Sequence, residues 1–458
     1  LLELLKSRLD IAGPISIDEL EQLFPGKRQE IEKLLAALEA EGFVFKGRFS
    51  PGGREEWCER RLLARIHRYT IDKLRSEIKP VSPAEFMHYL FHWQHVISED
   101  ESEVHLQLRK VLDQLEGYEA QSVAWEGDIL PARIKSYSYT SLDLLLMTGE
   151  YIWGRFKTGK TDPQQFTNVP IRTTPVTFIK RENLKYYLSP NDNADIDKLT
   201  VYARTIFKIL GDSGALFFFQ LEEKSRLLKS QVEDALTELI SVGLATSDSF
   251  TGLRTLLIPD KYYTEKRRSG KVIFDLQQAG RWWLLTHQEN KADGSQQDEY
   301  LESLAMMLLK RYGIVFRKLA EKEKVLFAWY DLLKIYRKME ARGIIRGGRF
   351  VEGFGGEQYA LPEAVSVVRS LRKQEPSESF ISISAADPLN LTGFITPGKR
   401  IASFYGNRIL YRNGIPVACK EGKEVIFLEE TDQETLWNMK KLLLHRDVQP
   451  ELRPYLVL

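Results

Sequence analysis

Hydrophobic positions recur at helical spacing between paired glycines, and this pattern occurs three times along the chain. The first glycine of a pair stands at 13, 214 and 313, and the second stands at 42, 243 and 343. The separation is 29 residues in the first two copies and 30 in the third. Between the glycines the pattern predicts two short amphipathic helices, and after the second glycine it predicts a β-hairpin that ends near a Phe.

A helix, a turn, a second helix, a glycine stop and a hairpin together make the winged-helix plan. The second helix of such a unit commonly enters a DNA groove. We therefore expect three winged-helix domains, at residues 1–60, 199–298 and 299–375, the middle one carrying an additional extended segment. Three copies in one chain indicate a protein that holds nucleic acid.

The remaining segments differ from the three copies in their hydrophobic pattern. Residues 61–198 read as a helical and mixed region, in which Phe86, Leu90 and Trp93 have helical spacing and predict one buried face. Residues 376–458 contain short β-prone runs, and Asn413-Gly414 is a strong hairpin signal. The expected fold class is α+β: three tandem winged helices, an intervening helical region, and a small C-terminal β-barrel or sheet with a terminal helix.

Composition narrows the class of protein without naming a function. The 458 residues are 43% hydrophobic and 28% charged, which is ordinary globular material of several domains. No apolar run approaches the roughly 20 residues of a membrane helix, so we expect no membrane partner. Cys58 and Cys419 are the only cysteines, which favours a cytoplasmic protein without disulfides. The N-terminus lacks Met, so the chain reads as a fragment of a longer protein.

Net charge is +1, so any DNA binding must come from local basic patches. The most basic is in the third copy, on its second helix and its wing, and a smaller patch is on the first wing. The predicted DNA-binding residues are Lys334, Arg337, Lys338, Arg342, Arg346, Arg349, Lys46 and Arg48. The alternative is a solvated helix face, mixed with Asp331 and Glu340. The second copy has an acidic wing and is expected to pack or dimerise.

Two motifs match known sites but lack the necessary context. Residues 154–161 fit the phosphate-loop pattern G-x-x-x-x-G-K-[ST], yet no sustained helix follows, which favours a basic surface loop. His88, His92 and His95 could face one side of a helix and hold zinc, but aromatic residues crowd that helix and no acidic ligand is evident. We predict no metal and no other cofactor.

Two acidic constellations could carry hydrolytic chemistry. The first contains Gln114 and Glu116, with Tyr118 and Trp125 as aromatic rings that could stack an extruded base. The second centres on Asp387, at a strand-to-turn junction. Because Asp before Pro is also a routine turn former, the spacing alone leaves a structural role open for it.

Longer stretches of the sequence, spread over nearly the whole chain, resemble a known protein family. They include LLARIHRYTIDKLRSEI, PVSPAEFMHYLFHWQHV, LDQLEGYEAQSVAWEGDILPARI, ARGIIRGGRFVEGFGGEQYALPEA and SAADPLNLTG. Together they resemble the C-terminal half of bacterial long-form Lhr proteins, the large helicase-related enzymes of superfamily 2. The resemblance implies tandem winged helices plus a β-barrel, similarity to AlkZ-type DNA glycosylases, and the uracil-DNA glycosylase activity of some members. It also implies that the helicase core lies in the N-terminal half, which is absent here.

The AlkZ-type enzymes use a Gln-x-Gln/Asp motif ahead of an Arg-containing stretch, and its nearest match here is Gln114-Leu115-Glu116 with Arg133 downstream. The third position departs from the motif but keeps a carboxylate. The expected function is therefore a monofunctional DNA glycosylase that excises uracil, with Glu116, Gln114 and Asp387 as candidate catalytic residues. On this hypothesis Glu116→Gln abolishes excision and leaves DNA affinity nearly unchanged.

The alternative is a non-catalytic DNA-binding and oligomerisation scaffold for the helicase motor. Aromatic runs at 217–219 and 282–283 could form self-association surfaces, or could be buried in cores. The expected partners are DNA, single-stranded or duplex, the helicase core of the full-length protein, and other copies of the chain in a homo-oligomer.

Overall fold

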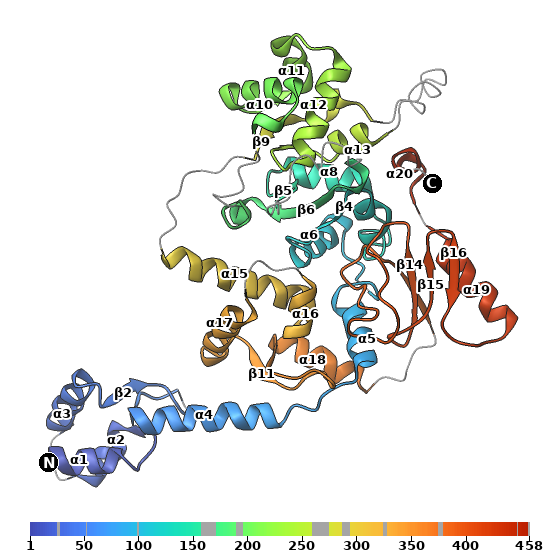
Figure 1. The fold of residues 1–458 in the computed structure, drawn as a ribbon. Coiled ribbons are helices and arrows are strands. Elements are labelled where there is room, and N and C mark those ends of the chain that lie inside the picture. Colours follow the sequence, from blue (N-terminus) through green and yellow to red (C-terminus); the bar gives the residue numbers. More distant parts are fainter. Residues whose placement is uncertain are drawn as a thin grey trace. The chain divides into compact units, whose positions relative to one another are not determined.

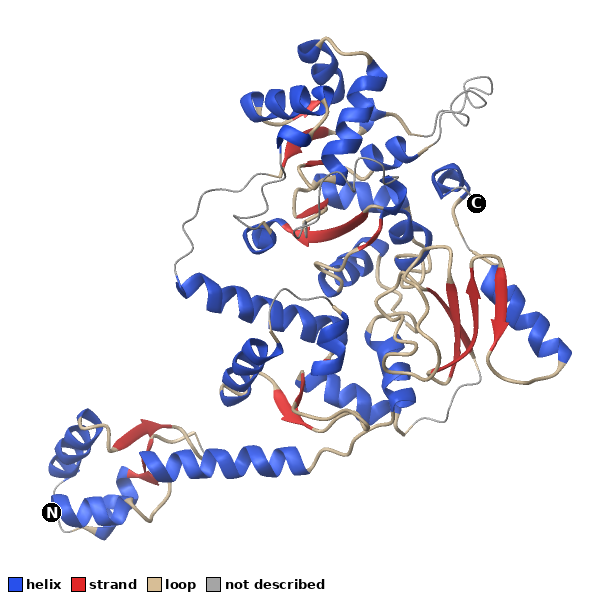
Figure 2. Ribbon diagram, viewed as in Figure 1, coloured by secondary structure: helices blue, strands red, loops and turns tan. Residues whose placement is uncertain are grey.

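The computed structural model describes residues 1–458 except 25–27, 52, 99, 157–170, 189–195, 259–273, 286–293, 324–327, 374–378, 447 and 457–458 (Figures 1 and 2). The chain divides into two compact units. Unit 1 comprises Leu1–Lys79 with Gly347–Arg349, and unit 2 comprises Pro80–Arg346 with Phe350–Leu458. Lys157–Thr161, most of the phosphate-loop match, lies outside the described residues.

Unit 1 contains a winged helix followed by one long helix. Its elements are α1 (Leu2–Leu9), β1 (Ile15–Ser16), α2 (Ile17–Leu23), α3 (Arg28–Ala40), β2 (Val44–Gly47), β3 (Glu56–Glu59) and α4 (Arg60–Ser76). The strands form an antiparallel sheet in the order β1-β3-β2. Apolar residues at helical spacing, including Leu5, Leu9, Ile31 and Leu35, make a core of this copy's own.

Unit 2 repeats this element order three times. The elements of the second copy are α6 (Val104–Gln114), β4 (Ala120–Gln121), α7 (Ser122–Ala124), η1 (Trp125–Ile129), α8 (Tyr139–Met147), β5 (Tyr151–Gly154) and β6 (Pro175–Lys180). Those of the third are α10 (Val201–Ser213), β7 (Leu216–Phe217), α11 (Phe218–Ser225), α12 (Lys229–Ser241), β8 (Ala245–Ser247) and β9 (Arg281–Leu284). Those of the fourth are α15 (Gly294–Tyr312), β10 (Ile314–Phe316), α16 (Arg317–Lys322), α17 (Trp329–Ala341), β11 (Arg346–Gly348) and β12 (Gln358–Ala360).

Each of these sheets places its third strand between the first and the second: β4-β6-β5, β7-β9-β8 and β10-β12-β11. Among the described residues the arrangement thus occurs four times, once more than the sequence pattern predicted. The additional copy lies inside the region expected to be merely helical and mixed. Like the others, it is marked by two glycines with positive φ, Gly117 at 73° and Gly149 at 76°.

Of the two expected forms of the C-terminal module, barrel or sheet, the structure shows an open four-stranded sheet. Its strands are β13 (Phe380–Ser384), β14 (Arg408–Arg412), β15 (Ile415–Glu421) and β16 (Glu424–Phe427), antiparallel in chain order, and α19 (Gln433–Leu444) packs on them. The predicted hairpin is confirmed: Asn413 and Gly414 have φ of 51° and 75° between β14 and β15.

The remaining elements connect or cover the copies. They are α5 (Pro83–Trp93), η3 (Ile171–Thr173), η4 (Arg181–Asn183), α9 (Leu184–Tyr187), η5 (Ile196–Lys198), α13 (Thr251–Leu257), η6 (Leu276–Gln278), α18 (Pro362–Leu371), η7 (Pro450–Leu452) and α20 (Arg453–Leu456). One hydrophobic core runs through the second and third copies and includes Leu456 of α20. Trp282 and Phe218 are fully buried in the core, whereas Phe217 and Phe219 are exposed. Within the described part of the chain, no helix is both long and apolar enough to cross a membrane.

Candidate functional site

Three segments that are far apart in the sequence meet at one buried ion pair. The guanidinium of Arg133 donates to both oxygens of Asp387, with Nη1–Oδ2 at 2.7 Å and Nη2–Oδ1 at 2.9 Å. Arg133 Nη2 also donates to Gln94 Oε1 at 2.8 Å. The two charged side chains are 0% and 1% exposed. A buried charge requires a partner with good hydrogen-bond geometry, and each of these two side chains supplies one for the other.

The loop that carries Asp387 is fixed by hydrogen bonds of its own. The amide of Leu389 donates to Asp387 Oδ1 at 2.9 Å, which is the local turn that Asp before Pro tends to form. Asn390 Nδ2 donates to the carbonyls of Ala385 and Ile401. The loop therefore holds the carboxylate in one place, as both the catalytic and the turn-forming interpretations require.

Lys322 and Tyr118 donate to carbonyls of the same loop. Lys322 Nζ donates to Pro388 O at 3.0 Å and also to Asn390 O. Burial lowers the pKa of Lys322 to about 8, so part of the population is neutral near neutral pH. Tyr118 Oη donates to Ala386 O at 2.9 Å, and burial raises the pKa of this phenol. Both contacts bring polar groups of two winged helices to the loop of the C-terminal module that carries Asp387.

Glu116 has a different set of partners. Its Oε1 accepts from the Lys180 amide at 3.0 Å and from Asn183 Nδ2 at 2.8 Å, at the start of η4. Its main-chain carbonyl accepts from Arg311. These bonds hold the chain reversal after β6, so the structure gives Glu116 a clear positional role and does not bring its carboxylate to Asp387.

Gln114 helps to terminate a helix. Its Nε2 donates to Trp93 O at 2.7 Å and to Lys310 O at 3.4 Å. The last carbonyls of α15 are orphan acceptors, as at any helix end, and side chains supply their donors. Trp93 Nε1 reaches Lys310 O, and Gln94 Nε2 reaches Arg311 O, both at 2.9 Å.

Trp125 belongs to the hydrophobic core. Its indole is 0% exposed, donates to Val176 O at 2.9 Å, and packs edge-on against Phe178 at 4.9 Å. A base could stack on Trp125 only after this core had opened. Tyr118 lies 6.4 Å from Trp125, ring to ring, at the edge of the same core.

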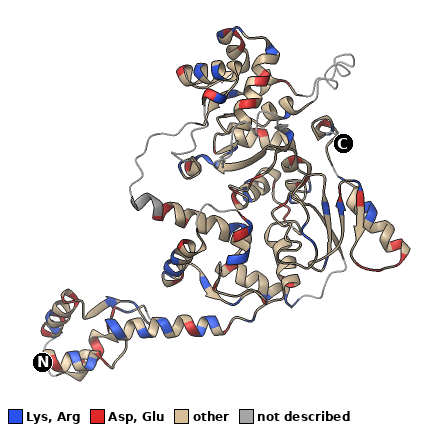
Figure 3. Cartoon of the chain, in the orientation of Figure 1, with Lys and Arg blue, Asp and Glu red and all other residues tan. Residues whose placement is uncertain are grey.

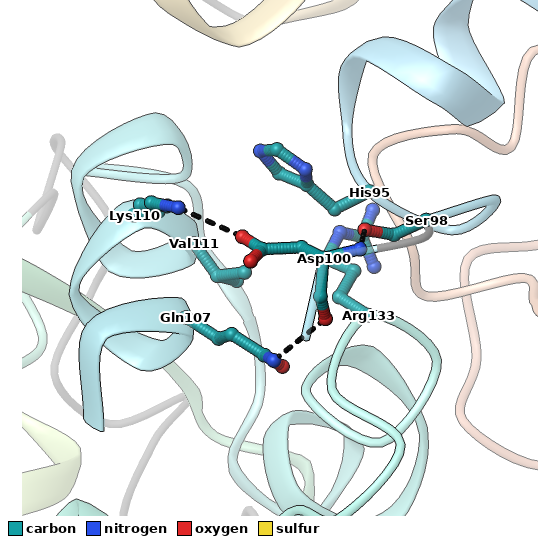
Figure 4. Close-up of a pocket in the computed structure, with 7 residues that line it drawn as sticks. All are labelled: His95, Ser98, Asp100, Gln107, Lys110, Val111 and Arg133. Carbon is teal, nitrogen blue, oxygen red and sulfur yellow. Dashed lines mark hydrogen bonds and ion pairs between the residues drawn. The ribbon is translucent and has the colours of Figure 1, made fainter. Parts of the chain in front are cut away.

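A small pocket borders Arg133 (Figure 4). It is lined by His95, Ser98, Asp100, Gln107, Lys110, Val111 and Arg133. Its volume of about 10 Å³ is room for one water molecule, so a nucleobase does not fit. Arg133 Nε is buried and has no hydrogen-bond partner among the described residues. Lys110, 2.7 Å from Asp100, holds the pKa of that carboxyl below its usual range.

The predicted DNA-binding cations in α17, and Arg342 directly after it, all lie on the surface, and each faces an acid. The pairs are Lys334–Asp331 at 3.3 Å, Arg337–Glu357 at 3.0 Å, Lys338–Asp298 at 2.9 Å and Arg342–Glu302 at 2.8 Å. Such exposed pairs are weak and can exchange partners. On the wings, Lys46 pairs with Glu55 at 3.0 Å, whereas Arg48, Arg346 and Arg349 are exposed.

Sequence reasoning missed a second buried ionic cluster. Arg254, in α13, donates from Nε to Glu126 at 2.7 Å and from Nη1 to Asp143 at 2.5 Å. Arg254 is 0% exposed, and Tyr137 Oη donates to Glu126 at 2.6 Å. The partners are over 100 residues apart, so no local motif could have joined them. This cluster ties the second winged helix to the third.

Two stretches of the chain match models of one protein family. Residues 81–171 and residues 294–380 each match a model described as "Large helicase-related protein, winged-helix domain". Both stretches are therefore similar to winged-helix domains of the large helicase-related family. The first stretch covers most of the copy that the glycine pattern had overlooked, and the second covers the predicted third copy.

Two proteins with Lhr in their names are similar to this chain over most of its length. The chain is 26% identical over 456 residues to "Lhr helicase/ probable uracil glycosylase" of Mycolicibacterium smegmatis, a match covering 93% of the chain. It is 27% identical over 460 residues to "Lhr helicase/uracil glycosylase" of Escherichia coli K12, a match covering 91% of the chain. In both cases the match spans 28% of the relative's length.

Proposed function

We propose that this chain is the DNA-binding region of an Lhr-type helicase and that it excises uracil from DNA, with Asp387 as the catalytic carboxylate. The observation that carries the proposal is that Arg133 binds the Asp387 carboxylate while Tyr118 and Lys322 bind carbonyls of the same loop. These three residues belong to two winged helices. The names of the two relatives support the choice of reaction. The winged helices support the choice of substrate, because their fold commonly binds DNA.

Hydrolytic excision needs an ionised carboxylate beside the sugar and no metal. Water adds to C1′ while the bond from C1′ to uracil breaks, the bonding electron pair leaves with the base, and the proton of the water passes to the carboxylate. A positioned acid or base of this kind contributes roughly 10²–10⁴-fold to a rate. In this proposal Arg133 pairs with Asp387 before DNA binds, and the loop from Ser384 to Asn390 sets the direction of the carboxylate.

The proposal requires movement on DNA binding. Asp387 is 1% exposed, and the pocket beside Arg133 holds only one water. An extruded nucleotide must therefore displace the Arg133 side chain or the loop of residues 384–390. Of the two candidate carboxylates, we favour Asp387 over Glu116, because the known bonds of Glu116 hold a chain turn.

The test is an excision assay on the 458-residue chain. It is incubated with an oligonucleotide containing one uracil, and abasic sites are then cleaved with alkali. The proposal predicts strand cleavage at the uracil and none in a matched oligonucleotide with thymine there. No cleavage above that control, together with retained DNA binding, would favour a non-catalytic scaffold for the helicase motor.

A further inference from the structure

Helix α4 is 17 residues long, and none of its residues is buried. It begins at Arg60, directly after the wing strand β3, and the side chain of Glu59 caps it by accepting from the Leu62 amide at 2.7 Å. A helix that buries none of its side chains is marginal in water, because most helical stability comes from packing of one face. Such a helix is a candidate for contact with a partner.

Helix α4 is rich in basic residues, and three of its arginines form a row along one face. The helix carries six Lys and Arg residues and one acidic residue, in a chain whose net charge is +1 (Figure 3). Arg61, Arg65 and Arg68 stand at i, i+4 and i+7 and therefore share one face. At 1.5 Å per residue the row spans about 10 Å, the axial length of about three successive phosphates of one DNA strand.

The three arginines of this row are exposed, and none forms an ion pair with a described residue. The cations of α17 differ, since each of them faces a carboxylate. A phosphate that meets the α4 row has no internal acid to displace. Arginine also binds phosphate with two parallel hydrogen bonds, which favours a row of phosphates over a diffuse anionic surface.

We infer that the Arg61, Arg65 and Arg68 face of α4 binds the phosphate backbone of DNA as an extension of the first winged helix. The inference rests on the proposed DNA-binding function and adds a contact outside the recognition helices. The row follows the wing in sequence, and exposed Arg48 lies in the loop after β2 of that wing. The first winged helix and α4 therefore offer phosphate contacts within one unit. These contacts carry no base information.

The experiment measures how affinity of the whole chain for a uracil-free duplex depends on salt. In the variant Arg61→Ala/Arg65→Ala/Arg68→Ala, the slope of log K against log salt falls by about 2 to 3, since each lost phosphate contact removes about 0.7–0.9. Alanine preserves the helix, which far-ultraviolet circular dichroism checks. The matching Arg→Lys triple keeps the slope. A control triple of exposed cations on α10 and α19, Arg204→Ala/Lys208→Ala/Lys440→Ala, also keeps it.

An unchanged slope in the alanine triple, with wild-type DNA binding intact, overturns the inference and leaves the proposed function standing. Absence of DNA binding by the wild type overturns both. Co-sedimentation with vesicles containing phosphatidylserine tests a membrane surface as the alternative, because a basic amphipathic helix can lie on one. Vesicle binding that is lost in the alanine triple, without a change in DNA slope, would replace DNA by lipid.

Discussion

The first and second winged helices have the same element order and strand order but use their charges in opposite ways. In the first, the ion pairs Lys6–Glu41, Arg28–Asp18 and Lys46–Glu55 are exposed. In the second, Glu126 and Arg133 are buried and are held by residues from other parts of the chain. The contrast shows that one fold can present charges to a polyanion or can fix charged groups in an interior.

The difference follows from what surrounds each copy. The first copy has a small core of its own, whereas the second shares a continuous core with the third copy and the C-terminal helices. Ions inside that larger core are removed from water, so each needs a partner with good geometry. Exposed ions need none, because water screens them.

The largest expected effect comes from breaking the buried cluster. Arg254→Met leaves Glu126 and Asp143 without their cation, and removal of one partner of a buried pair costs about 3–5 kcal/mol. Chemical denaturation should show this loss in the free energy of unfolding. The matched control is Arg28→Met in the first copy, whose exposed pairs predict a nearly unchanged value. Equal losses in the two variants would contradict the contrast between the copies.

The next effect concerns Lys322 and pH. Its pKa is about 8 in the folded chain and about 10.4 when unperturbed, so between these values the unfolded state binds more protons. Stability contributed by this group therefore rises as pH increases from about 8 to 10.5. Relative to Lys322→Met, the wild type should gain roughly 1–3 kcal/mol of unfolding free energy over that range. A difference that stays constant with pH would show that the amine is not desolvated.

The smallest expected effect is a change in the salt dependence of DNA binding when the wing of the fourth copy is altered. Arg346 and Arg349 are exposed, and their joint replacement by alanine should lower the salt slope of DNA binding by about 1.4–1.8 if both contact phosphate. Stability should hardly change, as neither side chain is buried. An unchanged slope would mean that this wing lies away from DNA, and that α4 or another surface supplies the contacts.

Local signals predicted much of the fold but not the ionic clusters. Paired glycines located three of the four copies, and Asn413-Gly414 located a hairpin. The hydrophobic pattern did not predict the second copy because its second helix, α7, is only three residues long. It continues into the π-helix η1, and this change of helix type interrupts the helical period. Its glycines at 117 and 149 are 32 residues apart and could have shown it.

The candidate site depends on contacts that no spacing encodes. Asp387 and Arg133 were both noticed in the sequence, but their pairing joins residues 254 positions apart. Gln114 and Glu116 sit two positions apart in a motif-like string, yet their side chains serve different helix and turn ends. Proximity in sequence therefore does not place the side chains of Gln114 and Glu116 at one site, whereas the Arg133–Asp387 pair is made by tertiary packing alone.

The most direct measurement compares Asp387→Asn with Glu116→Gln in single-turnover excision of uracil. We expect Asp387→Asn to lose at least about 10²-fold in rate with DNA affinity retained, and Glu116→Gln to stay near the wild type. Because an unpaired Arg133 destabilises the fold, the double variant Arg133→Gln/Asp387→Asn supplies a neutral pair; it should regain thermal stability and remain inactive. Full activity of Asp387→Asn, or loss of activity in Glu116→Gln alone, would contradict the account.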